Sequence, residues 1–352
     1  MTAPQVECFN CPTGVMGAGQ FIRALGRRAI SAVLLSVSLL GTSVYAQTER
    51  IDMAIFHPER NFWTPTLKWW MEEVDKATQG RVHFVANYAG ALVSANETLK
   101  AVRDGAVPAG VTSAAFITGT LPSLAYLEAI GGVPGGVAPF IESMEALRPV
   151  LQEEFHKQNV EYLWPQASGQ LVVVCRDRLI KNVADWKGRK VRTAGRWQGE
   201  QLLVLGSSPV SIDPSEQYLA LQNRTIDCAL SVSVLAATLK LHEVAPKISV
   251  LRMPVNATFY VINRDIWNKL SADDRAAVMR ISGEATKRSA AYLNEIQAEA
   301  ENQMRTQKAE VYQLSDAEVA DLRAAIAPAF AKMDAQGGEA GKRISTIVRR
   351  FW

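Results

Sequence analysis

Residues 185–231 read DWKGRKVRTAGRWQGEQLLVLGSSPVSIDPSEQYLALQNRTIDCALS and decide the fold. This stretch predicts three short strands separated by two helices, and the strands are Lys190–Thr193, Val210–Ile212 and Thr225–Leu230. Such an alternation of strands and helices is typical of a parallel sheet. In these sheets, ligands bind in the loops that follow the carboxyl ends of the strands. The sequence therefore predicts an α/β fold with a ligand site beside this stretch.

Local signals within the stretch set where its elements end. Gly206 is placed to stop the first helix, because glycine readily adopts the left-handed conformation that follows a helix. Residues 213–216 (DPSE) combine a capping acid, a proline at the first helical position and a glutamate at the third. Arg192 stands near the end of the first strand, just before the chain leaves it through Ala194 and Gly195. From its position alone, a surface salt bridge is the favoured interpretation of Arg192, because most arginines are exposed.

The composition is that of a globular protein large enough for two lobes. The chain has 352 residues, of which 48% are hydrophobic and 21% charged, and its net charge is +3. Residues 1–46 contain three arginines and one acid and so carry +2 of this charge, which leaves +1 for the remainder. A nearly neutral body argues against nucleic acid as a partner, since that would need a basic face.

Residues 1–46 are predicted to be a signal peptide with an N-terminal extension, and Met16 is an alternative start. Arg23, Arg27 and Arg28 precede the apolar run Ala29–Leu40, and Val44-Tyr45-Ala46 resembles a cleavage site. A retained anchor is the alternative, but the run is shorter than the roughly 20 residues that span a bilayer. We therefore expect a periplasmic protein.

Four cysteines suggest no metal site. Cys8 and Cys11 form an isolated CxxC upstream of the apolar run, where neither a zinc site nor a redox domain surrounds it. Cys175 and Cys228 fall on two predicted core strands. Two buried free thiols are the favoured interpretation, because free cysteine is commonly a core residue. A disulfide between them is the alternative, and it requires their Cα atoms to lie within about 7 Å of each other.

Apolar strands and amphipathic helices are predicted on both sides of the opening stretch. The expected strands are Ile51–Phe56, Val82–Tyr88, Gly110–Ser113, Val160–Trp164, Leu171–Cys175, Val250–Pro254 and Thr258–Asn263. The expected helices are 64–78, one capped by Ser94 and ending before Gly105, 142–157, 271–307 and 315–333. A turn over 334–341 precedes a basic amphipathic tail over 342–352. The helix from Ser271 either lies along both lobes or breaks at Gly283.

Three segments resemble the solute-binding proteins of TRAP transporters (tripartite ATP-independent periplasmic systems), and the resemblance covers about residues 51–333. Residues 88–111 read YAGALVSANETLKAVRDGAVPAGV and are similar to the family's strand, small-residue turn and helix ending in Asp-Gly. Residues 185–193 (DWKGRKVRT) resemble its Lys-Gly-x-Lys-x-Arg strand. Residues 206–229 (GSSPVSIDPSEQYLALQNRTIDCA) resemble its following run, with Cys228 in place of a glycine.

The resemblance implies a two-lobed periplasmic binding protein fold whose hinge is crossed several times and whose long C-terminal helix spans both lobes. We expect lobe I to comprise residues 47–169 and 258–297, and lobe II residues 170–257 and 298–352. It also implies a cleft that closes on a small organic acid, and membrane permease subunits as the partners that receive it. No cofactor is implied.

The resemblance assigns ligand contacts to three residues. Arg192 takes the place of the arginine that grips the ligand carboxylate; a surface salt bridge with Glu200 is the alternative. Ser231 stands four residues after the Asp of the Asp-Cys element, at a position that contacts ligand in the family. Gln170 stands where many relatives have a second polar or cationic group. Because a second cation is absent there, a monocarboxylate, hydroxy acid or keto acid is favoured over a dicarboxylate.

Position alone suggests three further contacts. His57 and Ser113 follow the first and third strands, where they would face the cleft or else cap a turn. Trp197 follows Arg192 by five residues and would be either a flat wall for an aromatic or branched acid or part of the helix packing.

Two other functions share this fold class. A secreted hydrolase is disfavoured because the chain has no G-x-S-x-G and no H-E-x-x-H. A ligand-sensing partner of a membrane receptor is the other alternative, and the sequence does not separate it from transport.

Overall fold

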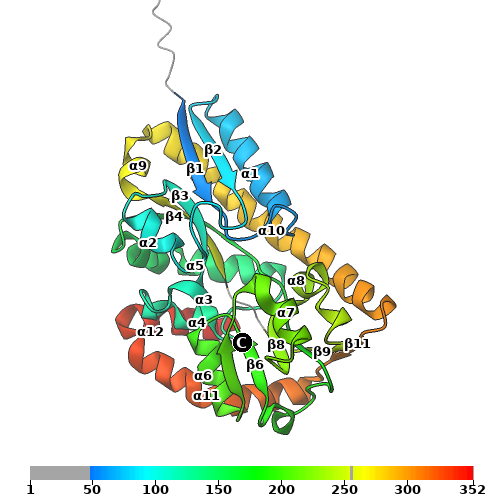
Figure 1. Cartoon of the computed structure of the whole chain (residues 1–352). Coiled ribbons are helices and arrows are strands. Elements are labelled where there is room, and N and C mark those ends of the chain that lie inside the picture. The colour runs from blue at the N-terminus through cyan, green and yellow to red at the C-terminus, as the bar shows by residue number, and fades with distance from the viewer. Residues whose placement is uncertain (1–47, 254–256, 352) are drawn as a thin grey trace, which may run out of the picture. The chain divides into compact units, whose positions relative to one another are not determined.

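The strands gather into two mixed sheets (Figure 1). The computed structural model describes residues 48–253 and 257–351. The predicted signal peptide and the Cys8–Cys11 pair therefore lie outside the described residues. Residues 47–352 form one compact unit that contains both sheets.

The first sheet is built mainly from the N-terminal part of the chain. Its order is β2 (Val82–Asn87), β1 (Glu49–Ala54), β3 (Ala109–Ser113), β10 (Thr258–Asn263) and β4 (Val160–Gln166). Strand β1 runs parallel to β2 and β3, whereas β10 returns antiparallel between β3 and β4. The accompanying helices are α1 (Thr64–Ala77), α2 (Thr98–Arg103), α3 (Ala114–Ile117), α4 (Ala125–Glu128) and α5 (Val137–His156).

The second sheet contains the opening stretch. Its order is β11 (Glu310–Gln313), β9 (Lys247–Val250), β5 (Leu171–Cys175), β8 (Cys228–Val232), β6 (Lys190–Thr193) and β7 (Ser208–Ser211). Strand β6 runs parallel to both β7 and β8, which confirms the predicted parallel unit. The helices of this part are α6 (Arg196–Val204), α7 (Gln217–Gln222) and α8 (Ser233–Thr238).

Helix α10 (Ala272–Thr306) is continuous through Gly283 and spans elements of both sheets (Figure 1). Its 35 residues correspond to about 53 Å at 1.5 Å per residue. It packs against α1 and β4 of the first sheet and against α8 and β11 of the second. An added side chain at Gly283 would meet only open space, so the glycine faces outward and has no reason to interrupt the helix. The prediction of one helix along both lobes is confirmed.

Local predictions failed where distant partners decide the structure. The strand expected over Val250–Pro254 lies earlier, at β9, because its pairing with β5 and with the unpredicted β11 ends at Val250. Ser94 does not cap α2, which begins at Thr98 after Glu97. The turn expected over 334–341 is mostly helical, since α11 (Asp316–Gln336) is separated from α12 (Gly338–Val348) only by Gly337.

Helix α12 exists because the tail has a surface to bury. Its apolar residues Ile344 and Val348 are fully buried. The helix packs against α5, α11 and the short 3-10 helix Pro122–Leu124. Tertiary packing of an apolar face, rather than local propensity, therefore sets this helix.

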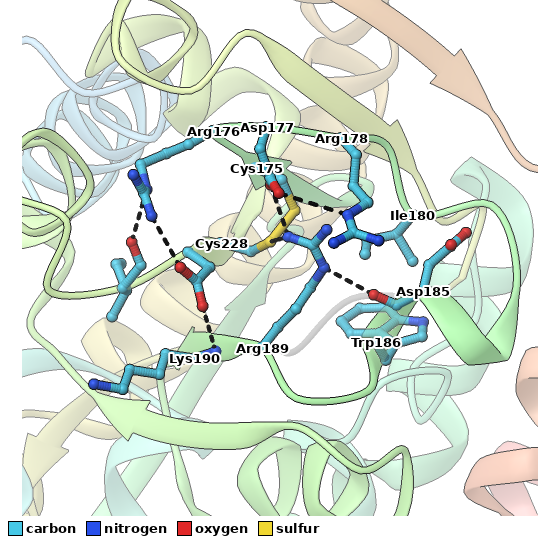
Figure 2. Close-up of polar contacts among 12 residues, drawn as sticks. Cys175, Arg176, Asp177, Arg178, Ile180, Asp185, Trp186, Arg189, Lys190 and Cys228 are labelled. Carbon is cyan, nitrogen blue, oxygen red and sulfur yellow. Dashed lines mark hydrogen bonds and ion pairs between the residues drawn. A yellow bond between two sulfur atoms is a disulfide. The ribbon is translucent and has the colours of Figure 1, made fainter.

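A disulfide joins Cys175 to Cys228, so the prediction of two free thiols is wrong (Figure 2). The two cysteines are register partners on β5 and β8, with Cα atoms 4.1 Å apart, and both are fully buried. Arg189 lies against the bridge: its Nη1 is 3.5 Å from Cys228 Sγ and donates to Asp177 at 2.8 Å (Figure 2). The bridge covalently links β5 to β8 at one end of the pair, and the other end of both strands reaches the site described next.

Candidate ligand-binding site

A cavity that opens to solvent lies between elements of the two sheets. From the first sheet and its loops come Phe56, Trp63, Ser113 and Phe116. The crossover after β4 supplies Ser168 and Leu171. The second sheet and its loops supply Arg192, Ala194, Gln198, Pro214, Leu230, Ser231, Val232 and Leu235. The cavity thus lies where β1, β3, β6 and β8 end, as predicted for ligand sites in α/β folds.

Arg192 is 3% exposed and is the one charged side chain among the described residues that line this cavity. Its Nε donates to the Ile212 carbonyl at 2.9 Å and its Nη1 to the Leu230 carbonyl at 2.8 Å. Its Nη2 is buried and has no partner. Burial lowers the pKa of Arg192 to about 10, so the side chain stays charged at neutral pH. The alternative salt bridge with Glu200 is wrong, because Glu200 pairs with Lys332.

Ser231 lies beside Arg192 on the neighbouring strand. Ala229 is the register partner of Arg192, and Ser231 is two residues further along β8. Since strand side chains alternate between faces, Arg192 and Ser231 project from the same face of the sheet. Ser231 is 5% exposed, and its Oγ is buried without a partner. The site therefore has a cation and a hydroxyl next to each other, each with unused hydrogen-bonding capacity.

Ser113 also lines the cavity, from the opposite sheet. It is the last residue of β3, and its Oγ donates to the Ala257 carbonyl at 3.4 Å. The structure thus brings together Arg192, Ser231 and Ser113 of the predicted contacts.

Gln170, His57 and Trp197 lie outside the wall of this cavity. Gln170 lines a neighbouring cavity, where its backbone N–H donates to Gln297 Oε1 at 2.9 Å. His57 is buried among the rings of Phe56, Trp63 and Tyr88. Burial lowers its pKa to about 4, so His57 is neutral at pH 7.

Trp197 is fully buried in the core. The guanidinium of Arg196 lies 4.8 Å from the centre of its ring. The structure therefore places Trp197 in helix packing, the second of its two predicted roles.

Glu128 is a buried carboxylate that no sequence pattern singles out. One of its oxygens accepts from the backbone N–H groups of Trp197 (2.6 Å) and Gln198 (3.2 Å), and the other accepts from Thr118 Oγ1 (2.7 Å). It therefore caps the N-terminus of α6, the helix that follows Arg192. Its backbone carbonyl accepts from Gln198 Nε2 at 3.1 Å, which orients a residue of the cavity wall.

We expect Glu128→Ala to lower the free energy of unfolding by about 1–3 kcal/mol, because two buried backbone N–H groups lose their acceptor. Glu128→Gln retains an accepting oxygen and should preserve most of this stability. Burial raises the pKa of Glu128 from 4.5 to about 7. The protonated form therefore favours the folded state, and this contribution is fully present below pH 4.5 and lost as the pH rises through 7.

Urea unfolding of wild type and Glu128→Gln between pH 4.5 and 8 measures this contribution. The stability difference between the two proteins should shift in favour of Glu128→Gln as the pH rises. A difference that does not change with pH would show that Glu128 does not titrate in this range.

Among the described residues, no group of three or more metal-binding side chains comes together, and no helix is long and apolar enough to cross a membrane. The described lining residues of the cavity offer one cation, a few hydroxyls, the amide of Gln198 and an otherwise apolar wall. Such a lining is suited to a small anionic molecule held through very few polar contacts.

Comparison with known proteins agrees with this geometry. A solute-binding protein of Albidiferax ferrireducens is 25% identical over 319 residues, covering 86% of this chain and 88% of the relative. In fold, the chain resembles a TRAP periplasmic solute-binding protein of Desulfovibrio salexigens with bound orotic acid (TM-score 0.80, 19% identity, 86% of this chain and 98% of that one). It also resembles one of Ralstonia eutropha with bound (S)-2-acetolactate (TM-score 0.75, 20% identity, 86% and 99%).

The decisive match is to a whole family. The family model described as "Bacterial extracellular solute-binding protein, family 7" matches residues 53–336, which include the cavity, the second sheet and all of the first sheet except the start of β1. Members of this family are extracytoplasmic binding proteins, in agreement with the predicted periplasmic location. The chain therefore belongs to bacterial extracellular solute-binding protein family 7, the binding-protein family of TRAP transporters.

Proposed function

We propose that this protein captures a small organic acid outside the cytoplasm, with Arg192 as the carboxylate clamp, and delivers it to the membrane subunits of a TRAP permease. One observation carries the proposal: the guanidinium of Arg192 is buried, oriented by two carbonyls and left with a free Nη2 at a cavity wall. Asp213 acts on Arg192 only through its charge, without an ion pair between the two side chains, so a ligand carboxylate would supply the direct counter-ion that a buried cation needs.

Arginine suits this role because it remains charged and its hydrogen bonds to carboxylates are short and strong. The carbonyls of Ile212 and Leu230 fix the plane of the guanidinium before any ligand arrives. We propose that the ligand carboxylate accepts from Nη2 of Arg192 and from Oγ of Ser231. Ser113 would contact the ligand from the opposite sheet. Gln170, His57 and Trp197 would act through the surrounding structure rather than by direct contact.

The ligand we propose is a monocarboxylate, with a hydroxy or keto acid favoured. The described lining residues provide one cation, so a second carboxylate would be desolvated without a counter-charge. The solved structures with orotic acid and (S)-2-acetolactate show that this fold accommodates ligands with a single carboxylate.

The same elements suggest how capture is achieved. The cavity wall comes from both sheets, so separating the sheets would open it. We propose the predicted lobes, residues 47–169 with 258–297 and residues 170–257 with 298–352, as the bodies that close on the ligand. Because α12 packs on α5, residues 338–348 would move with lobe I instead.

A calorimetric screen of organic acids tests the proposal. We expect one monocarboxylate per protein to bind and to be recovered chemically unchanged, because the site holds a binding cation and no catalytic constellation was found in the sequence. Turnover of the acid or of an ester would support the hydrolase alternative instead. Failure of every acid to bind would contradict the proposed function.

A further inference from the structure

Building on the proposed function, we infer that the acid carries a hydrocarbon body, branched or aromatic, with no second charge and no chain of hydroxyl groups. The inference concerns the part of the ligand that lies beyond its carboxylate. It follows from how the polar groups of the cavity wall are distributed and from which of them are already in use.

Unused polar capacity is confined to one end of the cavity. Among the described lining residues, the buried polar atoms without a partner are Nη2 of Arg192 and Oγ of Ser231. Both lie on the same face of neighbouring strands. Together they satisfy a carboxylate and at most one adjacent oxygen, such as a 2-oxo or 2-hydroxy group.

The remaining polar side chains already have partners. Gln198 accepts from the Ala194 N–H at 3.2 Å and donates to the Glu128 carbonyl at 3.1 Å, so both ends of its amide are used. Ser168 and Thr258 share a hydrogen bond of 3.2 Å. Hydroxyl groups along a ligand chain would therefore have to compete with the protein's own hydrogen bonds.

The rest of the wall is apolar and comes from both sheets. Its members are Phe56, Trp63, Phe116, Leu171, Ala194, Pro214, Leu230, Val232 and Leu235. Three of the aromatic rings pack edge to face, with Phe56 5.4 Å from Phe116 and 5.9 Å from Trp63. The indole of Trp63 is further fixed by donating to the Ala167 carbonyl at 3.1 Å. These rings form a rigid surface opposite Arg192 that matches a hydrocarbon body.

Two affinity trends follow. Each methylene buried on such a wall strengthens binding by roughly fourfold. Each hydroxyl buried there without a partner weakens binding by roughly tenfold. A second carboxylate would lack a counter-ion and weaken binding further.

The experiment measures dissociation constants by calorimetry for acids that share a 2-oxo carboxylate and differ in body. Pyruvate, 2-oxobutanoate, 2-oxopentanoate, 4-methyl-2-oxopentanoate and phenylpyruvate form the apolar series. 2-Oxoglutarate adds a dicarboxylate to this series, and gluconate, which has a 2-hydroxy group in place of the 2-oxo group, is a polyhydroxy acid for comparison. We expect affinity to rise about fourfold per carbon through 2-oxopentanoate. The branched or the aromatic acid should bind at least tenfold more tightly than gluconate and 2-oxoglutarate.

Matched substitutions on α8 and at its C-cap locate the effect. Leu235 lines the cavity, whereas Leu239 directly follows the same helix as its C-cap residue, is also partly buried and does not line the cavity. Leu235→Asn should weaken 4-methyl-2-oxopentanoate about tenfold and pyruvate less than twofold, and Leu239→Asn should change neither. Equal losses for both acids with Leu235→Asn, or no loss for either, would overturn the inference.

The outcomes separate this inference from the proposed function. If gluconate or 2-oxoglutarate binds most tightly and Arg192→Met abolishes that binding, the hydrocarbon body is wrong and the carboxylate clamp stands. If no acid binds, or if binding is indifferent to Arg192→Met, the proposed function itself fails.

Discussion

Substitution of Arg192 by methionine is expected to weaken acid binding by a hundredfold to several thousandfold, or about 3–5 kcal/mol. The loss is large because the ligand carboxylate would enter a buried site that has lost the one cation among its described lining residues. Methionine fills a similar volume and leaves no buried charge, but the Ile212 and Leu230 carbonyls lose their donor, so we expect a folded variant whose free energy of unfolding is lower by about 1–3 kcal/mol. Arg192→Lys should recover part of the affinity, since an ammonium group restores the charge but not the two carbonyl contacts that orient it.

Isothermal calorimetry with the tightest acid measures this effect, and circular dichroism confirms that each variant is folded. Arg178→Met is the matched control, because Arg178 is largely exposed, does not line the cavity and pairs with Asp177 at 3.5 Å. The affinity of this control variant for the acid should stay within twofold of wild type. If Arg192→Met bound within threefold of wild type, the clamp would be refuted.

Removal of the Cys175–Cys228 disulfide is expected to lower the free energy of unfolding by about 4 kcal/mol. The bridge joins residues 53 positions apart, and opening a loop of this length restores a large conformational entropy to the unfolded chain. The double variant Cys175→Ala/Cys228→Ala avoids leaving buried thiols. Urea unfolding, compared with wild type with and without reductant, measures the difference.

Ligand affinity should respond far less to the same change. Leu171 and Ser231 line the cavity, whereas Cys175 ends β5 and Cys228 begins β8, away from it. The folded double variant should therefore bind the acid within about threefold of wild type. Unchanged stability after complete reduction, verified by thiol titration, would contradict the structural role of the bridge.

Local chemistry made much of the fold predictable. Ser271 and Ser315 cap α10 and α11 as their positions indicate, and Asp213 accepts from the Ser215 N–H as a cap should. Strands β6 and β10 have the predicted bounds, because short runs of β-prone residues beside turn residues define them. These features depend on residues that lie within a few positions of one another.

Features that depend on distant partners were not predictable in the same way. The disulfide requires Cys175 and Cys228 to be register partners, and no local pattern specifies that register. Strand β11 forms only because β9 offers it an edge. Helix α12 forms because α5 and its neighbours cover its apolar face.

The residues of the site also differ in whether local sequence or distant partners determine their position. Arg192 and Ser231 stand near the ends of strands that their own sequences define, so their arrival at one cavity could be expected. Trp197 follows Arg192 by only five residues, but its side chain is buried in the core. Glu128 carries no signal, since its role is to cap a helix that begins 68 positions later, at Arg196.

A crystal structure of the protein with its tightest acid tests the central claim most directly. The account predicts ligand density in the cavity between the two sheets, with a carboxylate oxygen about 2.7–2.9 Å from Arg192 Nη2. The same carboxylate should accept a second hydrogen bond from the Oγ of Ser231. Ligand bound elsewhere, or bound in this cavity with its carboxylate turned away from Arg192, would contradict the account.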